Sequence, residues 1–147
     1  RVFPVSKVRG LSTAEPGAEE AQALGLGPGE SVIHIDRVRF LNEQPFINER
    51  VTLPAACFAE FGLDMEKVPN TLYEYYQLRY GITISRATEQ IEATVANAED
   101  EACLHVAPAH PLLLVSRITY DLQDRPIEFR RSRVNTSHNF VYRAELR

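Results

Sequence analysis

The sequence has few of the features that mark metal centres, membrane proteins or nucleic-acid-binding surfaces. Its two cysteines, Cys57 and Cys103, lie far apart and in no metal-ligand spacing, so we expect two reduced, unbridged thiols. No apolar run approaches the roughly 18 residues of a membrane-spanning helix, and no signal-peptide pattern is present. The formal net charge of -4 comes without a basic block, which argues against direct binding to DNA. Together these absences favour a cytoplasmic domain with no membrane partner.

Catalytic motifs are also missing. The four histidines, His34, His105, His110 and His138, have no metal-ligand spacing, and there is no nucleophile elbow, CxxC pair or nucleotide-binding loop. The glycine-rich segment 25–29 leads into a predicted strand and not into a helix, which is typical of a turn. We therefore predict no catalytic residue, no metal and no cofactor.

What is present is an ordinary globular composition, with 44% hydrophobic and 24% charged residues in a chain of 147. A chain of this size folds around one core, so we predict a single domain over residues 1–147. The chain begins at Arg1 and not at a methionine, so we expect it to be a fragment of a longer protein.

The two parts of the chain resemble each other. The segment that starts at Ala18 aligns with the segment that starts at Ala98, at an offset of 80 that becomes 81 before Pro126. Identical residues include Arg37 with Arg117, and both segments share the same order of helix, turn and strand signals. An internal duplication is therefore predicted.

Each repeat is expected to contain a short helix with an acidic first turn, followed by a β-hairpin. The first strands of the two hairpins are predicted at 31–41 and 111–122, with turns at 42–44 and 123–125. A helix over 71–80 is closed by Gly81, and single strands are predicted at 2–8, 82–96 and 140–146. Hairpins with helices between them indicate an α+β domain built on an antiparallel sheet.

Several polar residues stand out against this pattern. Arg37 and Arg39 share one strand face with aliphatic residues, so they either grip one anion together or end in solvent. Glu49 alternates with Ile47 and Val51, and a buried carboxylate there needs an arginine or a ligand as its partner.

Three further positions allow two interpretations. Glu128 alternates with Ile127 and Phe129, which is compatible with solvent exposure as well as with a role in a site. Thr71 and Tyr73 lie at a predicted helix start, where a hydroxyl at position 71 either caps the helix or contacts an anionic ligand. The tyrosines at 75, 76 and 80 are expected to pack against the core.

An ordered set of short motifs over nearly the whole chain resembles the UTRA domain of HutC-type regulators in the GntR family. These motifs include Asp36-Arg37-Val38-Arg39, Pro45 with Glu49, Thr71-Leu72-Tyr73, Tyr80-Gly81-Ile82 and Arg125-Pro126-Ile127-Glu128. The family's R-x-R pair falls on Arg37 and Arg39, its hairpin glutamate on Glu49, its S-L-Y motif on 71–73 and its P-x-E glutamate on Glu128. Two departures are the threonine at 71 and Val134 near a position where members often have tyrosine.

The resemblance implies a chorismate-lyase-like fold that binds a small anionic effector, either a sugar phosphate or a carboxylate. It also implies a homodimeric transcriptional repressor whose operator DNA is bound by a separate N-terminal winged helix-turn-helix domain. Arg37, Arg39, Glu49, Thr71, Tyr73 and Glu128 are then the effector-binding residues. Two alternatives stay open, a chorismate-lyase-like enzyme acting on a small carboxylate and a bare dimerisation module.

Overall fold

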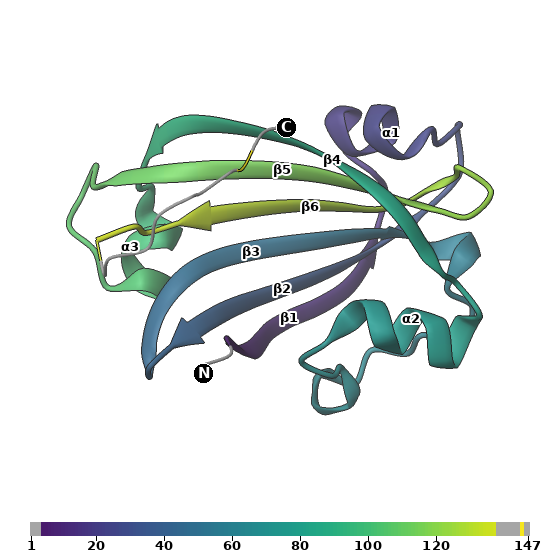
Figure 1. Ribbon diagram of the computed structural model, residues 1–147, viewed down its shortest axis with the longest axis horizontal. Coiled ribbons are helices and arrows are strands. Elements are labelled where there is room, and N and C mark those ends of the chain that lie inside the picture. The colour runs from purple at the N-terminus through teal and green to yellow at the C-terminus, as the bar shows by residue number, and fades with distance from the viewer. Residues whose placement is uncertain (1–3, 138–144, 146–147) are drawn as a thin grey trace.

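The computed structural model describes residues 4–137 and residue 145, and all its strands belong to one antiparallel sheet (Figure 1). In sheet order the strands are β1 (Val5–Ala14), β2 (Val32–Leu41), β3 (Gln44–Pro54), β6 (Pro126–Val134), β5 (Pro111–Asp121) and β4 (Ile84–Val95). The helices are α1 (Ala18–Leu24), α2 (Leu72–Tyr80) and α3 (Ala98–Leu104), with 3₁₀ turns η1 (Ala55–Cys57) and η2 (Met65–Lys67). The predicted α+β class with an antiparallel sheet is confirmed.

The two parts of the chain repeat one order of elements. β1, α1, β2 and β3 are matched by β4, α3, β5 and β6, and the sheet places β3 beside β6 at its centre and β1 and β4 at its edges. Two helices pack against the opposite half of the chain. α1 of the first half contacts β6 of the second, and α3 of the second half contacts β3 of the first. Each half therefore covers a strand of the other.

Both predicted hairpins form, and their turns have local causes. Asn42 and Glu43 form a two-residue turn with positive φ angles of 50° and 64°, which suits the right-handed twist of the paired strands. In the second turn the carboxylate of Asp121 accepts hydrogen bonds from the backbone N–H groups of Gln123 and Arg125. These short connections fix the register of β2 with β3 and of β5 with β6.

Side-chain alternation on the strands gives the sheet two different faces. On β2, Ile33 and Ile35 pack against α2, while Val32 packs near α1 and Val38 near α3. The largest core cluster lies under α2 and consists of Ile33, Ile35, Val51, Leu53, Phe58, Leu72, Tyr76, Ile82 and Ile127. Helix α2 thus lies on the opposite face from α1 and α3, and it covers only part of that face.

Several boundaries differ from the sequence prediction; β4, for example, was predicted at 82–96 and runs from Ile84 to Val95. β1 runs from Val5 to Ala14 and not over 2–8, because its second half pairs with β2 through a bulge between Val8 and Gly10. α2 begins at Leu72 and ends at Tyr80, and Gly81, which has a φ of 65°, closes it as predicted. The strand predicted at 140–146 falls almost entirely outside the described residues.

Candidate functional site

The polar residues singled out in the sequence gather on the sheet face that carries α2. Arg37 lies directly opposite Glu49 in the ladder between β2 and β3, and its Nε donates a hydrogen bond to Glu49 Oε2. Ser132 on β6 donates to the other carboxylate oxygen, Oε1, at 2.7 Å. Both charged side chains are only 2% exposed. The partner that Glu49 was expected to need is therefore an arginine of the neighbouring strand.

The environment of Glu49 keeps it ionised. Burial by itself raises the pKa of this carboxyl, but the charges of Arg130 and Arg37 and the Ser132 hydroxyl outweigh burial and hold the pKa below its ordinary value. Glu49 thus acts as a fixed negative charge beneath the arginines.

Glu128 is completely buried, so the solvent-exposed alternative is wrong for this residue. Arg130 binds its carboxylate with two hydrogen bonds, Nε to Oε1 at 2.9 Å and Nη2 to Oε2 at 3.0 Å. Tyr76 of α2 donates to Oε2 at 2.5 Å. Burial, reinforced by Glu128, raises the pKa of Tyr76 well above its ordinary value, so the phenol stays protonated. This bond ties α2 to β6.

Arg39 differs from the other arginines of this face. Its Nε donates to Ser6 Oγ at 3.1 Å, and no carboxylate among residues 4–137 forms an ion pair with it. Burial lowers its pKa, and the positive charges of Arg37, Arg130 and Arg117 act in the same direction against the attraction of Glu49. A bound anion would relieve this repulsion.

The start of α2 faces the same region. Thr71 is the N-cap residue, but its hydroxyl makes no capping hydrogen bond, and the side chain of Asn70 instead contacts the backbone of Pro4 and Ser6. The interpretation of the position-71 hydroxyl as a helix cap is therefore wrong. The Thr71 hydroxyl and the first N–H groups of α2 stay available to a ligand.

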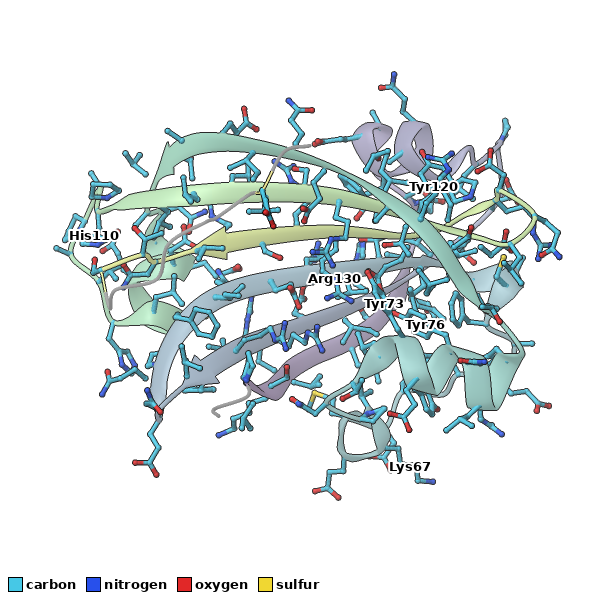
Figure 2. All side chains as sticks on the ribbon, in the orientation of Figure 1. Lys67, Tyr73, Tyr76, His110, Tyr120 and Arg130 are labelled. Carbon is cyan, nitrogen blue, oxygen red and sulfur yellow. The ribbon has the colours of Figure 1, made fainter. Side chains whose placement is uncertain are left out.

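Tyr73 joins α2 to the second half of the sheet. Its hydroxyl lies 3.0 Å from Thr119 Oγ1 and accepts a hydrogen bond from Arg117 Nη1 at 3.2 Å. Arg117 also binds Glu89 of β4 at 2.8 and 3.0 Å. The Arg130 guanidinium lies 5.2 Å from the centre of the Tyr73 ring. Figure 2 shows Tyr73, Tyr76 and Arg130 together between α2 and the central strands.

Two adjoining cavities open over these residues. The first, of about 350 Å³, is lined by Pro4, Arg37, Arg39, Asn70, Thr71, Leu72, Tyr73 and Arg130. The second, of about 230 Å³, is lined by Arg39, Ile47, Glu49, Glu89, Ile91, Leu113, Val115, Arg117, Arg130, Ser132 and Val134. Arg39 and Arg130 belong to both.

Five of the six predicted site residues line these cavities, and Glu128 lies beneath them. Sequence reasoning missed Arg130, Ser132 and Glu89, and it identified Arg117 only as the counterpart of Arg37 in the repeat. The alternation of Glu128, Arg130 and Ser132 on one strand face was the signal that could have found two of them. Glu89 had no such signal, because only the pairing of β4 with β5 brings it opposite Arg117.

Other kinds of site find no support in the described part of the chain. It contains no cluster of histidine, cysteine, aspartate or glutamate side chains that could hold a metal ion. None of its helices is long and apolar enough to cross a membrane. Cys57 and Cys103 are both free, and burial raises the pKa of each thiol.

Comparison with known proteins identifies the family. The family model of the UTRA domain matches residues 2–138. The transcriptional repressor STM4068 of Salmonella typhimurium is 33% identical over 122 residues, which are 81% of this chain and 50% of the repressor. The repressor NagR of Bacillus subtilis is 29% identical over 117 residues, 80% of this chain and 47% of that protein. The chain thus spans about half the length of these relatives.

A solved structure extends the similarity to the whole domain. The ligand-binding domain of a GntR-family regulator from Bordetella bronchiseptica superposes with a TM-score of 0.92 at 33% identity, over 99% of this chain and 90% of that one. The relatives are transcriptional regulators and not enzymes. The chain therefore belongs to the UTRA family, the effector-binding domains of GntR-type, HutC-like transcriptional regulators.

Proposed function

We propose that this domain senses a small anion, which binds where Arg39 faces the start of α2. The observation that carries the proposal is the charge of Arg39, which is partly buried and has no carboxylate partner among the described residues. Thr71 and Tyr73 offer hydroxyls from the other side of the same cavity. A charge-assisted hydrogen bond to such an anion contributes about 1.5–3 kcal/mol.

The other proposed site residues act around this contact. Arg37 lines the anion cavity while Glu49 holds its guanidinium in place, and Glu128 holds Arg130 at the junction of the two cavities. Glu49 also lines the second cavity, where it can accept hydrogen bonds from polar groups of the ligand.

We further propose that the bound anion is read out by DNA binding in an intact cytoplasmic repressor. A ligand shifts a conformational equilibrium only when it binds one conformation better than the other. An anion held by Arg39 of β2 and Thr71 before α2 pulls two separate elements together, and α2 would transmit the movement. Coupling of about 1–3 kcal/mol, or 5–150-fold in operator affinity, is the usual size for such a link. The operator itself would be bound by a winged helix-turn-helix domain N-terminal to this single domain.

A homodimer fits the same role, because two DNA-binding domains match two operator half-sites. β4 is an edge strand with most of its residues exposed, and such edges pair readily with another chain. Sedimentation at tens of micromolar tests the dimer, and a monomer would contradict it.

We also interpret the repeated order of elements as a duplication within a chorismate-lyase-like fold.

The anion proposal is tested by calorimetry on the unmodified chain and on two variants. The probes are inorganic phosphate, phosphate esters, acetate and larger carboxylic acids. Arg39→Gln is expected to weaken binding at least tenfold, while Arg50→Gln on the opposite sheet face leaves it unchanged. Equal losses of anion affinity in both variants would show only a general effect of removing a positive charge.

The effect on DNA binding is tested by operator titration of the full-length protein with and without the best ligand. The two operator affinities should differ, and equal affinities would refute the sensor.

A further inference from the structure

The second cavity has a polar end and an apolar wall. Its polar end consists of the charged residues around Arg39. Its wall consists of aliphatic side chains from four different strands, namely Ile47, Ile91, Leu113, Val115 and Val134. Ile47, Val134, Leu113 and Val115 also pack against one another as a cluster. The wall is therefore a continuous apolar surface that begins next to the anion contact.

Such a wall selects against hydroxylated ligands. The wall side chains have no hydrogen-bonding groups, and the backbone groups between paired strands are already bonded to each other. A sugar hydroxyl pressed against this surface loses its water partners and gains none, which is unfavourable. A hydrocarbon body in the same place gains from the removal of apolar surface from water. The wall thus favours an apolar ligand body.

The charges at the polar end leave room for one negative charge. Arg37 binds Glu49, Arg117 binds Glu89 and Arg130 binds Glu128, so each acid on this face already has one arginine. Among the arginines that line the two cavities, Arg39 is the one without a carboxylate partner in the described part of the chain. A single carboxylate balances it, whereas a phosphate ester carries roughly -1.5 to -2 at pH 7. The balance favours a monoanion.

We propose that the effector is a monocarboxylate with a compact aliphatic or aromatic body. Its carboxylate binds Arg39 at the junction of the two cavities, and its body lies against the wall of Ile47, Ile91, Leu113, Val115 and Val134. This inference rests on the proposed anion-sensing function and decides between the two ligand classes, sugar phosphate and carboxylate. Neither the charge balance nor the apolar wall suits a sugar phosphate.

The test is calorimetry on the 147-residue chain with four probes. Phenylacetate and hexanoate carry one carboxylate on an apolar body, gluconate carries one carboxylate on a hydroxylated body, and glucose 6-phosphate carries the alternative head group. Phenylacetate or hexanoate is expected to bind at least tenfold more tightly than gluconate and glucose 6-phosphate. Arg39→Gln should weaken the preferred probe at least tenfold.

A matched pair of variants tests the wall without endangering the fold. Ile91 and Val95 are both on β4 and both partly exposed, at 39% and 56%, but only Ile91 lines the cavity. Ile91→Thr should weaken the apolar carboxylate severalfold and leave gluconate unaffected. Val95→Thr should change neither.

The outcomes separate this inference from the function on which it rests. Tighter binding of glucose 6-phosphate or of gluconate, dependent on Arg39, would overturn the apolar carboxylate and keep the anion sensor. Binding of phenylacetate that is insensitive to Arg39→Gln would overturn both the head-group contact and the sensor site. Failure of all four probes at millimolar concentration would also overturn both.

Discussion

Arg50 lies directly opposite Arg131 in the ladder between β3 and β6. At the offset of 81 these two arginines are also each other's counterparts in the repeat that the sequence predicts. Their like charges are compensated from different elements. Arg50 binds Asp36 of β2 at 2.7 and 2.9 Å, and Arg131 binds Glu19 of α1 at 2.7 Å.

The first prediction is that neither half folds alone. α1 of the first half covers β6 of the second, and α3 of the second covers β3 of the first, so each separated half loses the partner of its own helix. A fragment ending before β4 should show little cooperative unfolding by circular dichroism. Mixing the two fragments should restore it. A fragment with its own sharp thermal transition would contradict the exchange of helices between halves.

The second prediction contrasts two arginines of the first hairpin. Arg37→Ala leaves Glu49 buried without its ion-pair partner and should lower the free energy of unfolding by about 3–5 kcal/mol. Arg50→Ala removes an ion pair whose arginine is half exposed and should lower it by less than about 1 kcal/mol. Urea unfolding at neutral pH measures both. Similar values for the two variants would mean that water reaches Glu49.

The third prediction concerns the bond between α2 and β6. Tyr76→Phe removes one of the donors to the buried carboxylate of Glu128 and should lower the free energy of unfolding by about 1–3 kcal/mol. Tyr73→Phe removes a hydroxyl at a part-exposed position, where water can replace it, and the loss should be smaller. Hydrogen exchange of the α2 amides should quicken in the first variant. Unchanged exchange there would show that other contacts hold the helix.

The fourth prediction is a loss of stability in acid. Glu49, Glu20 and Asp100 all have pKa values below their ordinary values of 4.5, 4.5 and 3.8, because burial is outweighed by hydrogen bonds and, for Glu49 and Asp100, also by arginine charges. A carboxyl with a lowered pKa stabilises the fold at pH values above its unfolded pKa and loses that contribution as pH falls through the folded pKa. The free energy of unfolding should therefore be level from pH 7 to about 5 and fall below that.

A control for the acid prediction is Glu20→Gln, which replaces the carboxylate that contacts His34 and Thr52 with a group that does not titrate. This variant should be less stable at pH 7 and lose less on acidification. Urea midpoints at several pH values report both effects. A stability that stays constant down to pH 3 would be inconsistent with the lowered pKa values.

The fifth prediction separates ligand binding from helix capping at Thr71. Because its hydroxyl makes no capping bond, Thr71→Val should change the free energy of unfolding by less than about 0.5 kcal/mol. The same substitution should weaken the effector severalfold, whereas Thr71→Ser should retain affinity. Thermal unfolding and calorimetry on the same samples check the two effects. A large loss of stability would mean that the hydroxyl caps α2 after all.

The sequence by itself determined the local elements and the faces on which polar residues lie. Alternation placed Arg37 and Arg39 on one face of their strand and Glu49 on the same face as Ile47 and Val51 in the next strand. Gly81 ended α2, and the repeated segments indicated the two hairpins. These features depend on neighbours within a few positions along the chain, where the period of a strand and the φ preference of glycine are decisive.

Only the tertiary structure decided which charges compensate each other. Residues from β2, β3 and β6 meet in the cluster of Arg37, Glu49 and Ser132. The sequence predicted an arginine or a ligand as the partner of Glu49 without deciding between them, and it gave no sign of Ser132. The bond between Tyr76 and Glu128 required α2 to settle over the strand that follows the second hairpin. Sheet order and register fix such long-range partners, because a buried charge takes whichever counter-charge the neighbouring strand brings within hydrogen-bonding distance. By the same rule Arg39 was left without one among the described residues.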